Sequence, residues 1–191
     1  MGKWIAMLLV CSSMQAHALE VEGVKLEDKV QVGNAAVQLN GAGLRSIFFM
    51  KIYVAALYLE SKQTTAEAIL ADSGAKRMAL HVVVGEAGSE RFVHAFRNDM
   101  EKNTAPAQFA VLLGRIEALE KAFENVKTVT RGDTIAFDWL PGKGTHVTLN
   151  GKELGNIQGE DFYRALLSIW IGEEPVNETL KKELVGNQGG D

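Results

Sequence analysis

Cysteine is almost absent from the 191-residue chain, which has only Cys11, and proline occurs three times. Since Cys11 lies in a segment that we expect to be removed, the mature chain would have no disulfide, thiol nucleophile, iron–sulfur cluster or cysteine zinc site. Positively charged residues are outnumbered: 20 Lys and Arg against 24 Asp and Glu give a net charge of −4. This charge argues against a nucleic-acid partner. Past the N-terminal segment, no run is long and apolar enough to span a membrane.

A secretory signal peptide is predicted at the N-terminus, MGKWIAMLLVCSSMQAHALE. Lys3 gives a positive start, residues 4–10 an apolar stretch, and residues 16–18 (AHA) a cleavage site. Cleavage would leave residues 19–191 as one soluble domain in the periplasm or outside the cell. Two alternatives are a buried N-terminal helix and a lipoprotein anchored through Cys11, although Val10 is a poor residue before a lipidated cysteine.

The hydrophobic pattern changes along the chain between strand-like and helical periods. AAVQLNGAG alternates before an Asn40-Gly41 turn signal, and IFFMKIYVAALYL and RMALHVVVG are typical of buried strands. Helical spacing follows over 89–100 and 109–123. VKTVTRGDTIAFDWLPGKGTHVTLNGKELGNIQG then predicts a meander of short strands, and helices resume near Glu160 and over 177–185. This order predicts an α+β fold, with helices laid over an antiparallel sheet.

Motifs for common chemistry are missing. Residues 131–133 (RGD) match a cell-adhesion tripeptide, but between two strand-like runs they are ordinary turn chemistry. His81, His94 and His146 are far apart and have no metal-ligand spacing. There is no G-x-S-x-G, Gly-rich phosphate loop or paired-carboxylate signature. We therefore expect no metal and no cofactor, while the pattern does not decide whether a haem or flavonoid-like ring can enter the protein.

Arg45 needs an explanation, because a guanidinium is costly to bury without a partner and the segment around it, LNGAGLRSIFFMKIYVAALYLE, is strongly apolar. Either Arg45 is an exposed residue at a strand start, or it lies in a pocket with Tyr53. On one continuous strand the two side chains would point to the same face of the sheet. A break near Phe49-Met50 would instead place them opposite one another on two strands. In both arrangements a guanidinium and a phenol inside an apolar cavity suit a carboxylate with an apolar tail.

The segment GAGLRSIFFMKIYVAALYLE resembles the signature region of the chalcone isomerase fold: a glycine-rich turn, an arginine, and a strand of the form K-apolar-x-V-x-x-L-Y-L. FYRALLSIWIGEEPVNETLKKELVG resembles that family's C-terminal helices, and the likeness runs in order over about 19–186. It is greatest to the bacterial, exported chalcone isomerase-like proteins. The resemblance implies an open-faced β-sandwich, in which an antiparallel sheet is covered on one face by helices and a ligand pocket lies between them.

The same resemblance implies roles for two residues. Arg45 matches the arginine that stabilises an oxyanion in plant chalcone isomerases and holds a carboxylate in plastid fatty-acid-binding proteins. Tyr53 stands where the isomerases have a catalytic threonine and the fatty-acid binders have a tyrosine. The pair therefore resembles the binders more than the enzymes.

Other positions depart from the isomerase pattern in the same comparison. Arg91, His94 and Asn98 have the spacing of an isomerase tyrosine, lysine and asparagine, of which only the asparagine is kept. Ile169 replaces a polar threonine or serine that meets the substrate. An oxyanion site that loses several donors loses orders of magnitude in rate, so we do not expect efficient chalcone cyclisation.

Three hypotheses follow. The first is non-catalytic binding of a small amphiphilic carboxylate, with a fatty acid as the expected ligand, headed by Arg45 and Tyr53. The second is an isomerase or intramolecular lyase on an unknown substrate, in which Arg45 stabilises an oxyanion and Tyr53 or His94 moves a proton. The third is an interaction protein with a vestigial pocket and an unknown protein partner. Candidates for core or pocket lining are Phe48, Phe49, Leu57, Phe92, Phe96 and Trp170.

Overall fold

The computed structural model of the chain describes residues 19–186, so the predicted signal peptide, residues 1–18, lies outside the described residues. The strands are β1 (Leu19–Val21), β2 (Val24–Leu26), β3 (Lys29–Val32), β4 (Ala35–Ile47), β5 (Met50–Leu59), β6 (Lys76–Val82), β7 (Glu86–Gly88), β8 (Thr128–Thr130), β9 (Thr134–Leu140), β10 (Gly144–Leu149) and β11 (Lys152–Ile157). The helices are α1 (Ala66–Ala71), α2 (Ser89–Lys102), α3 (Pro106–Ala122), α4 (Glu160–Ile171) and α5 (Glu178–Leu184).

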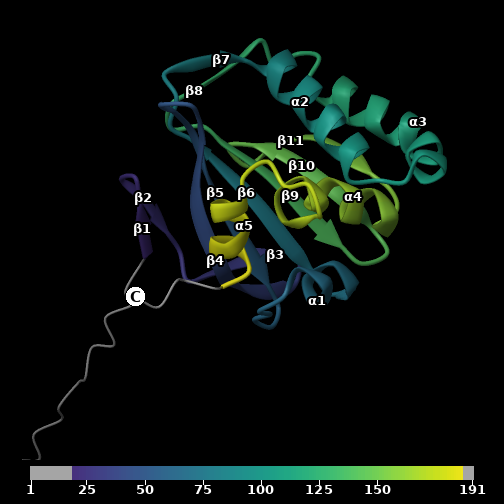
Figure 1. Ribbon diagram of the computed structural model, residues 1–191, viewed down its shortest axis with the longest axis horizontal. Helices are drawn as coiled ribbons and strands as arrows, with labels where there is room; N and C mark the ends of the chain where they lie inside the picture. The colour runs from purple at the N-terminus through teal and green to yellow at the C-terminus, as the bar shows by residue number, and fades with distance from the viewer. Residues whose placement is uncertain (1–18, 187–191) are drawn as a thin grey trace, which may run out of the picture.

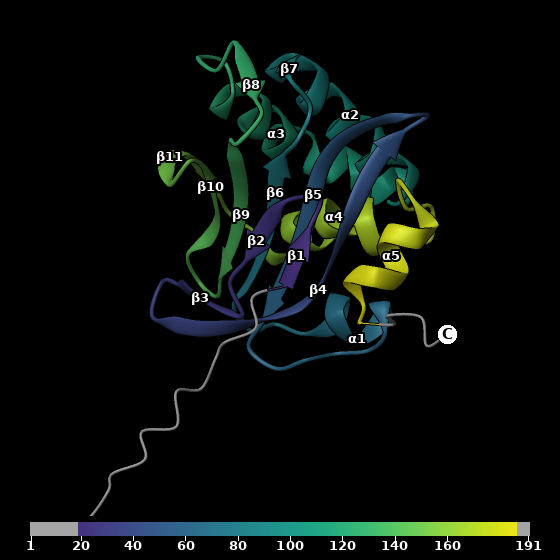
Figure 2. The ribbon, with the colours of Figure 1, turned by 90° about the vertical axis from the view of Figure 1, so that its left-hand side faces the viewer.

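Seven strands form one antiparallel sheet in the order β11-β10-β9-β6-β5-β4-β3. Helices α2, α3, α4 and α5 lie together on one side of this sheet (Figure 1). The β1–β2 hairpin lies on the other side (Figure 2), where its apolar side chains pack against the sheet. The predicted α+β fold, with helices covering one face of an antiparallel sheet, is confirmed.

Two apolar cores lie on opposite faces of the sheet, because successive side chains of a strand point to opposite sides. On β5, Tyr53 and Leu57 belong to the core under the helices. Val54 and Tyr58 belong to the smaller core under the β1–β2 hairpin. β5 is therefore buried on both faces, which explains why its sequence is continuously apolar instead of alternating.

The sheet is strongly curled, and a partly buried ion pair lies where its edge strand returns over its middle. Bulges interrupt the β4–β5 pairing after Leu39 and after Arg45, and bulges bend a strand and increase its twist. Arg77 of β6 donates from Nε to Asp138 Oδ1 of β9 at 2.6 Å. Its Nη2 also donates to the Gln31 carbonyl of β3 at 3.3 Å. In the sheet order, β4 and β5 lie between β3 and β6, so this bond does not join neighbouring strands. The edge strand thus folds back over the middle of the sheet.

The predicted turn at Asn40-Gly41 is wrong, since both residues lie inside β4. Asn40 Nδ2 donates to the Leu184 carbonyl at the end of α5 at 2.8 Å, and its Oδ1 accepts from the Gln63 amide at 2.8 Å. A Cβ on Gly41 would meet the backbone carbonyls of Glu183 and Leu184. The pair therefore serves helix docking: the amide binds the helix end, and the glycine lets the helix approach.

The turn of this hairpin is instead Phe48-Phe49, since Ile47 pairs with Met50. Other predicted features are confirmed: Gly132, with φ of +95°, turns the RGD segment between β8 and β9, and the 177–185 prediction matches α5 with its Asn177 cap. Helix α1 and strands β1, β2, β3 and β7 were not predicted, because all are short and none has a full apolar period.

Candidate functional site

The β4–β5 hairpin places Arg45 directly opposite Tyr53. Of the two arrangements that the sequence allows, the structure has the one that requires a break near Phe49. The two-residue turn reverses the chain, and the bulge after Arg45 shifts the pairing by one residue, so that Arg45 lies opposite Tyr53 instead of Ile52. Both side chains then lie on the helix-facing side of the sheet. Cross-strand neighbours on one face have Cβ atoms about 4.5–5.5 Å apart. The turn and the bulge together therefore place the cation and the phenol side by side.

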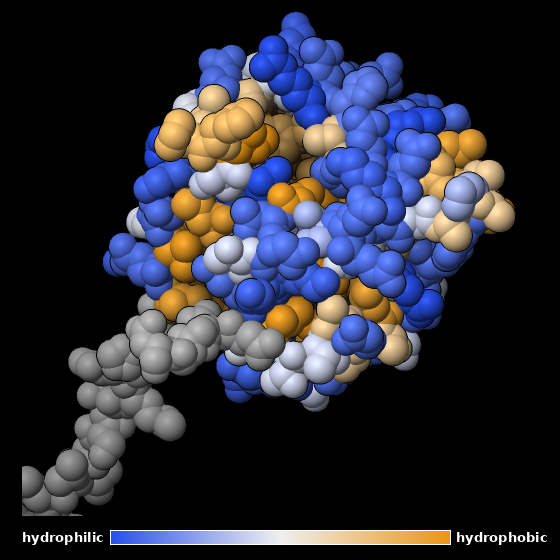
Figure 3. Space-filling view, in the orientation of Figure 1, coloured by the Kyte–Doolittle hydropathy of each residue, from blue (hydrophilic) through white to orange (hydrophobic). Residues whose placement is uncertain are grey.

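A cavity of about 310 Å³ opens beside this pair, between the end of the hairpin and helix α2. Its apolar wall comes from the hairpin, the β6–β7 connection, α2, α4 and the segment before α5, and comprises Ile47, Met50, Ile52, Val84, Ala87, Phe92, Ala95, Phe96, Ile169 and Val176. Its polar lining consists of Arg45, Tyr53, Glu86, Arg91 and Asp99. Figure 3 shows a hollow at this end of the molecule, next to an apolar projection. The cavity is an apolar chamber with a few charged groups and one phenol.

Tyr53 is held in a defined orientation by Trp170. The indole Nε1 of Trp170 donates to Tyr53 Oη at 2.9 Å, and both side chains are buried. Burial raises the pKa of Tyr53 to about 12, against the opposing effects of this hydrogen bond and of the Arg45 charge. The phenol therefore remains protonated at neutral pH. Since its oxygen already accepts from Trp170, its own O–H proton is free to be donated to a ligand.

Arg45 is half-buried, and most of its donor capacity is unused within the protein. Its Nη1 donates to the carbonyl of the adjacent Ser46 at 2.6 Å. In the part of the chain from 19 to 186, no carboxylate lies within 4.0 Å of the guanidinium of Arg45 or of Arg91. Asp99, in contrast, is paired with Lys102 at 2.8 Å. The cavity thus contains two cations without an acidic partner, and one of them lies beside the Tyr53 hydroxyl.

The structure brings together four of the six predicted site residues. Arg45, Tyr53, Arg91 and Ile169 line the cavity. His94 lines a separate hollow next to the end of α3, with Glu120 and Phe123. Asn98 is exposed and is not part of the cavity lining. At about 100° per residue, the row Arg91, Ala95 and Asp99 faces the chamber, and His94 is turned to the other side of α2.

The list of core or lining candidates needs one correction. Phe92 and Phe96 do line the cavity, and Leu57 and Trp170 are buried. Phe48 and Phe49, however, are 95% and 103% exposed, because they form the turn of the hairpin and not part of its strand face.

Sequence reasoning missed Asp99, Glu86 and the role of Trp170 as the partner of Tyr53. Helical spacing alone would have found Asp99, which is eight residues after Arg91 on the same face of α2. No local signal points to the bond between Trp170 and Tyr53, because 117 positions separate them.

Over residues 19–186, no group of three or more His, Cys, Asp or Glu is arranged to hold a metal ion. None of the helices in the same range has the length and hydropathy that a membrane span requires.

The family model described as chalcone isomerase-like matches residues 18–186. The chain therefore belongs to the chalcone isomerase-like family. Its fold is similar to the crystal structure of an Arabidopsis thaliana fatty-acid binding protein, with a TM-score of 0.66 and 18% sequence identity over 86% of this chain and 93% of that chain. A search of curated protein sequences finds no significant relative.

Proposed function

We propose that this protein binds a fatty acid, or a similar amphiphilic carboxylate, in the cavity beside Arg45 and Tyr53 and does not transform it. The observation that carries the proposal is the cross-strand pair itself: an arginine without an acidic partner lies beside a phenol whose oxygen is already occupied by Trp170. A carboxylate accepts from both donors at once, and its apolar tail suits the rest of the lining.

The shape and lining of the cavity support an apolar tail. Beyond its polar groups the chamber is walled by aliphatic side chains and by Phe92 and Phe96, whose ring centroids are 6.3 Å apart. Its volume of about 310 Å³ is near the lower end of the range of ligand pockets. A single chain of short or medium length fits this description better than a large ring system. The similar Arabidopsis structure is named as a fatty-acid binding protein, which agrees with this choice at the level of the fold.

Two observations favour binding over an isomerase reaction. A general acid or base works best when its pKa is near the operating pH, and burial raises the pKa of Tyr53 to about 12. His94, the other residue considered for proton transfer, lines a different hollow. The proposal also includes export: removal of residues 1–18 would leave the binding domain in the periplasm or outside the cell.

The proposal is tested by native mass spectrometry of the purified protein, with lipid analysis of the denatured extract. We expect a fatty acid to co-purify with the wild type and to be lost from Arg45→Met, which removes the charge and keeps an apolar side chain. Arg164→Met is the matched control, because Arg164 is an exposed arginine of α4 that pairs with Glu160 at 3.1 Å and does not line the cavity. An empty wild type that also gains no thermal stability from added fatty acids would overturn the proposal and leave the interaction-protein hypothesis.

A further inference from the structure

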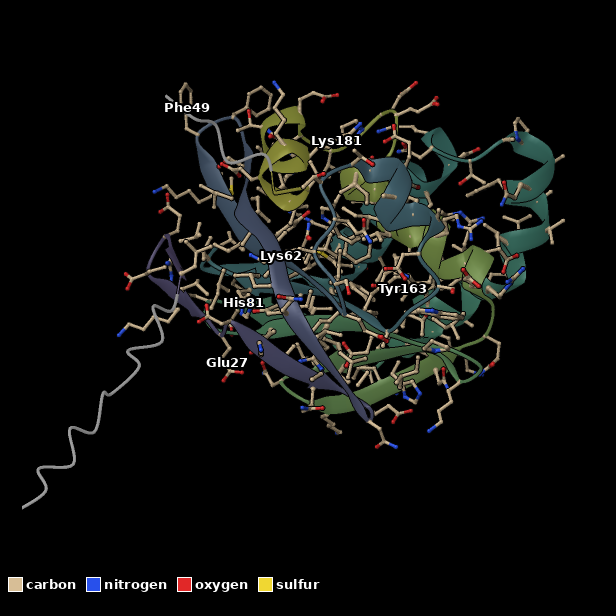
Figure 4. The ribbon with its side chains drawn as sticks, turned by 90° about the horizontal axis from the view of Figure 1, so that it is seen from below. Glu27, Phe49, Lys62, His81, Tyr163 and Lys181 are labelled. Atoms are coloured by element: carbon tan, nitrogen blue, oxygen red, sulfur yellow. The ribbon has the colours of Figure 1, made fainter. Side chains whose placement is uncertain are left out.

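The tip of the β4–β5 hairpin is an apolar projection whose two turn residues are almost fully exposed. Phe48 and Phe49 are 95% and 103% exposed, and the flanking Ile47 and Met50 are 46% and 58% exposed. Figure 4 shows Phe49 at the extreme end of the hairpin, pointing away from the molecule. Single exposed apolar residues are common on protein surfaces, but four in succession on one protrusion are not.

The backbone of this tip is unfavourable for the residues that it carries. Phe48 has φ of +52°, a left-handed conformation that glycine and asparagine adopt readily and aromatic residues rarely do. Two-residue hairpin turns ordinarily use those small or polar residues. Folding alone therefore gives no reason for phenylalanine at this position. Strained residues of this kind concentrate where they serve binding.

The projection is continuous with the cavity. Ile47 and Met50, which flank the two phenylalanines, are also part of the cavity wall. Phe49 and Met50 border a second hollow on the other side of the hairpin, together with Lys51 and Arg131. An apolar surface thus runs from the exposed rings directly into the chamber.

The charges at this end differ from those of the whole chain. The chain has a net charge of −4. The charged residues that line the two hollows beside the tip are Arg45, Lys51, Arg91 and Arg131 against Glu22, Glu86 and Asp99. The lining of these hollows therefore has a net charge of +1, opposite in sign to that of the whole chain, which suits a surface of anionic headgroups.

We propose that the Phe48–Phe49 tip inserts into the headgroup region of an anionic phospholipid bilayer. The two rings form a narrow convex projection that can enter the apolar region below the lipid headgroups. The cations behind the rings can then contact the negatively charged headgroups. Docking in this way sets the mouth of the cavity against the membrane. An amphiphile could then pass between the bilayer and the cavity without crossing water. This consequence rests on the proposed function, whereas the docking of the tip is independent of it.

The test is sedimentation of the purified protein with vesicles of phosphatidylglycerol and phosphatidylcholine in equal parts. The double variant Phe48→Asn, Phe49→Ser removes both rings, and asparagine tolerates the backbone of position 48. We expect its vesicle partition coefficient to be about a hundredfold lower than that of the wild type, since two rings no longer enter the lipid. Val111→Ser is the matched control: Val111 of α3 is 70% exposed but lies away from the tip, and its loss should leave partitioning unchanged.

A fluorescent reporter tests insertion directly. Phe49→Trp keeps an aromatic ring at the tip, and Val111→Trp places one at the control position. Only the tip reporter should shift to the blue and be quenched by brominated lipid when vesicles are added. A wild type that stays in the supernatant, or a double variant that sediments equally well, would overturn the proposal. So would a dimer in solution that the double variant abolishes, because the tip would then bind a second copy.

The two proposals fail separately. Binding of a soluble, medium-chain fatty acid without vesicles tests only the cavity, and neither Phe48 nor Phe49 lines it. The double variant should bind this acid as the wild type does. A wild type that does not bind the acid but still partitions onto vesicles would refute the proposed function, and the docking proposal would stand.

Discussion

Replacing Tyr53 with phenylalanine removes one oxygen atom and affects both the stability and the proposed ligand site. In the folded protein this oxygen accepts a hydrogen bond from Trp170 Nε1 at 2.9 Å, and Trp170 is fully buried. Without the acceptor, the indole N–H is left unpaired in the core. A buried polar group without a partner costs about 1–3 kcal/mol, so we expect the free energy of unfolding to fall by about this amount.

The same substitution removes one of the two donors proposed for the ligand carboxylate. A hydrogen bond to a charged group contributes about 1.5–3 kcal/mol, which corresponds to a dissociation constant raised by about tenfold to a hundredfold. Arg45 would still hold the carboxylate, so binding should be weakened and not abolished. Isothermal titration with a soluble fatty acid measures this effect, and urea denaturation measures the loss of stability.

Tyr58→Phe provides the matched control for both measurements. Tyr58 is on the same strand and is 3% exposed, but it faces the smaller core on the other side of the sheet. Its substitution should leave the affinity for the fatty acid unchanged. The reasoning would be refuted by a Tyr53→Phe variant that is less stable than the wild type yet binds the acid equally well, since the hydroxyl would then serve Trp170 alone.

The remaining predictions concern the fold. In Gly41→Ala, a Cβ would meet backbone carbonyls at the end of α5, so the free energy of unfolding should fall by about 1–3 kcal/mol in urea denaturation. Gly114→Ala in α3 has open space around it, and the same assay should show a gain of about 1 kcal/mol. Burial lowers the pKa of His81 from its ordinary 6.5, which favours the neutral ring in the folded state. The stability that His81 contributes is thus present above pH 6.5 and lost as the pH falls below it, and urea midpoints across this range should fall less steeply in His81→Asn.

The sequence predicted the fold well because its periodic signals are long. The helical spacing around Phe92 and Phe109, the meander of short strands and the predicted helix over 177–185 each agree with the structure. The hairpin was harder to predict. Asn40-Gly41 has a typical turn composition but lies within β4, whereas Phe48-Phe49 has none and forms the turn. Contacts with α5 keep Asn40-Gly41 within a strand. No local propensity explains why Phe48-Phe49 forms the turn.

The site was predictable only in part, for a similar reason. An arginine in an apolar segment indicated an anion site, and two possible geometries placed Tyr53 near it. The bond from Trp170 that orients the phenol joins α4 to β5 across most of the chain, and no spacing rule reveals it. The predicted roles of Arg91 and Ile169 remain predictions, although both residues line the cavity. His94 was placed by alignment with a family pattern, and its helical position directs it to another hollow.

The most direct test of the central claim compares a soluble fatty acid with its methyl ester, which keeps the tail but carries no charge. Isothermal titration of the wild type should show the acid binding at least about tenfold more tightly than the ester, because only the acid accepts charge-assisted hydrogen bonds from Arg45 and Tyr53. In Arg45→Met the preference for the acid should be clearly smaller than in the wild type, because only Tyr53 is left to donate to the carboxylate. A wild type that binds the ester as tightly as the acid would contradict the account, since the cavity would then recognise only the tail.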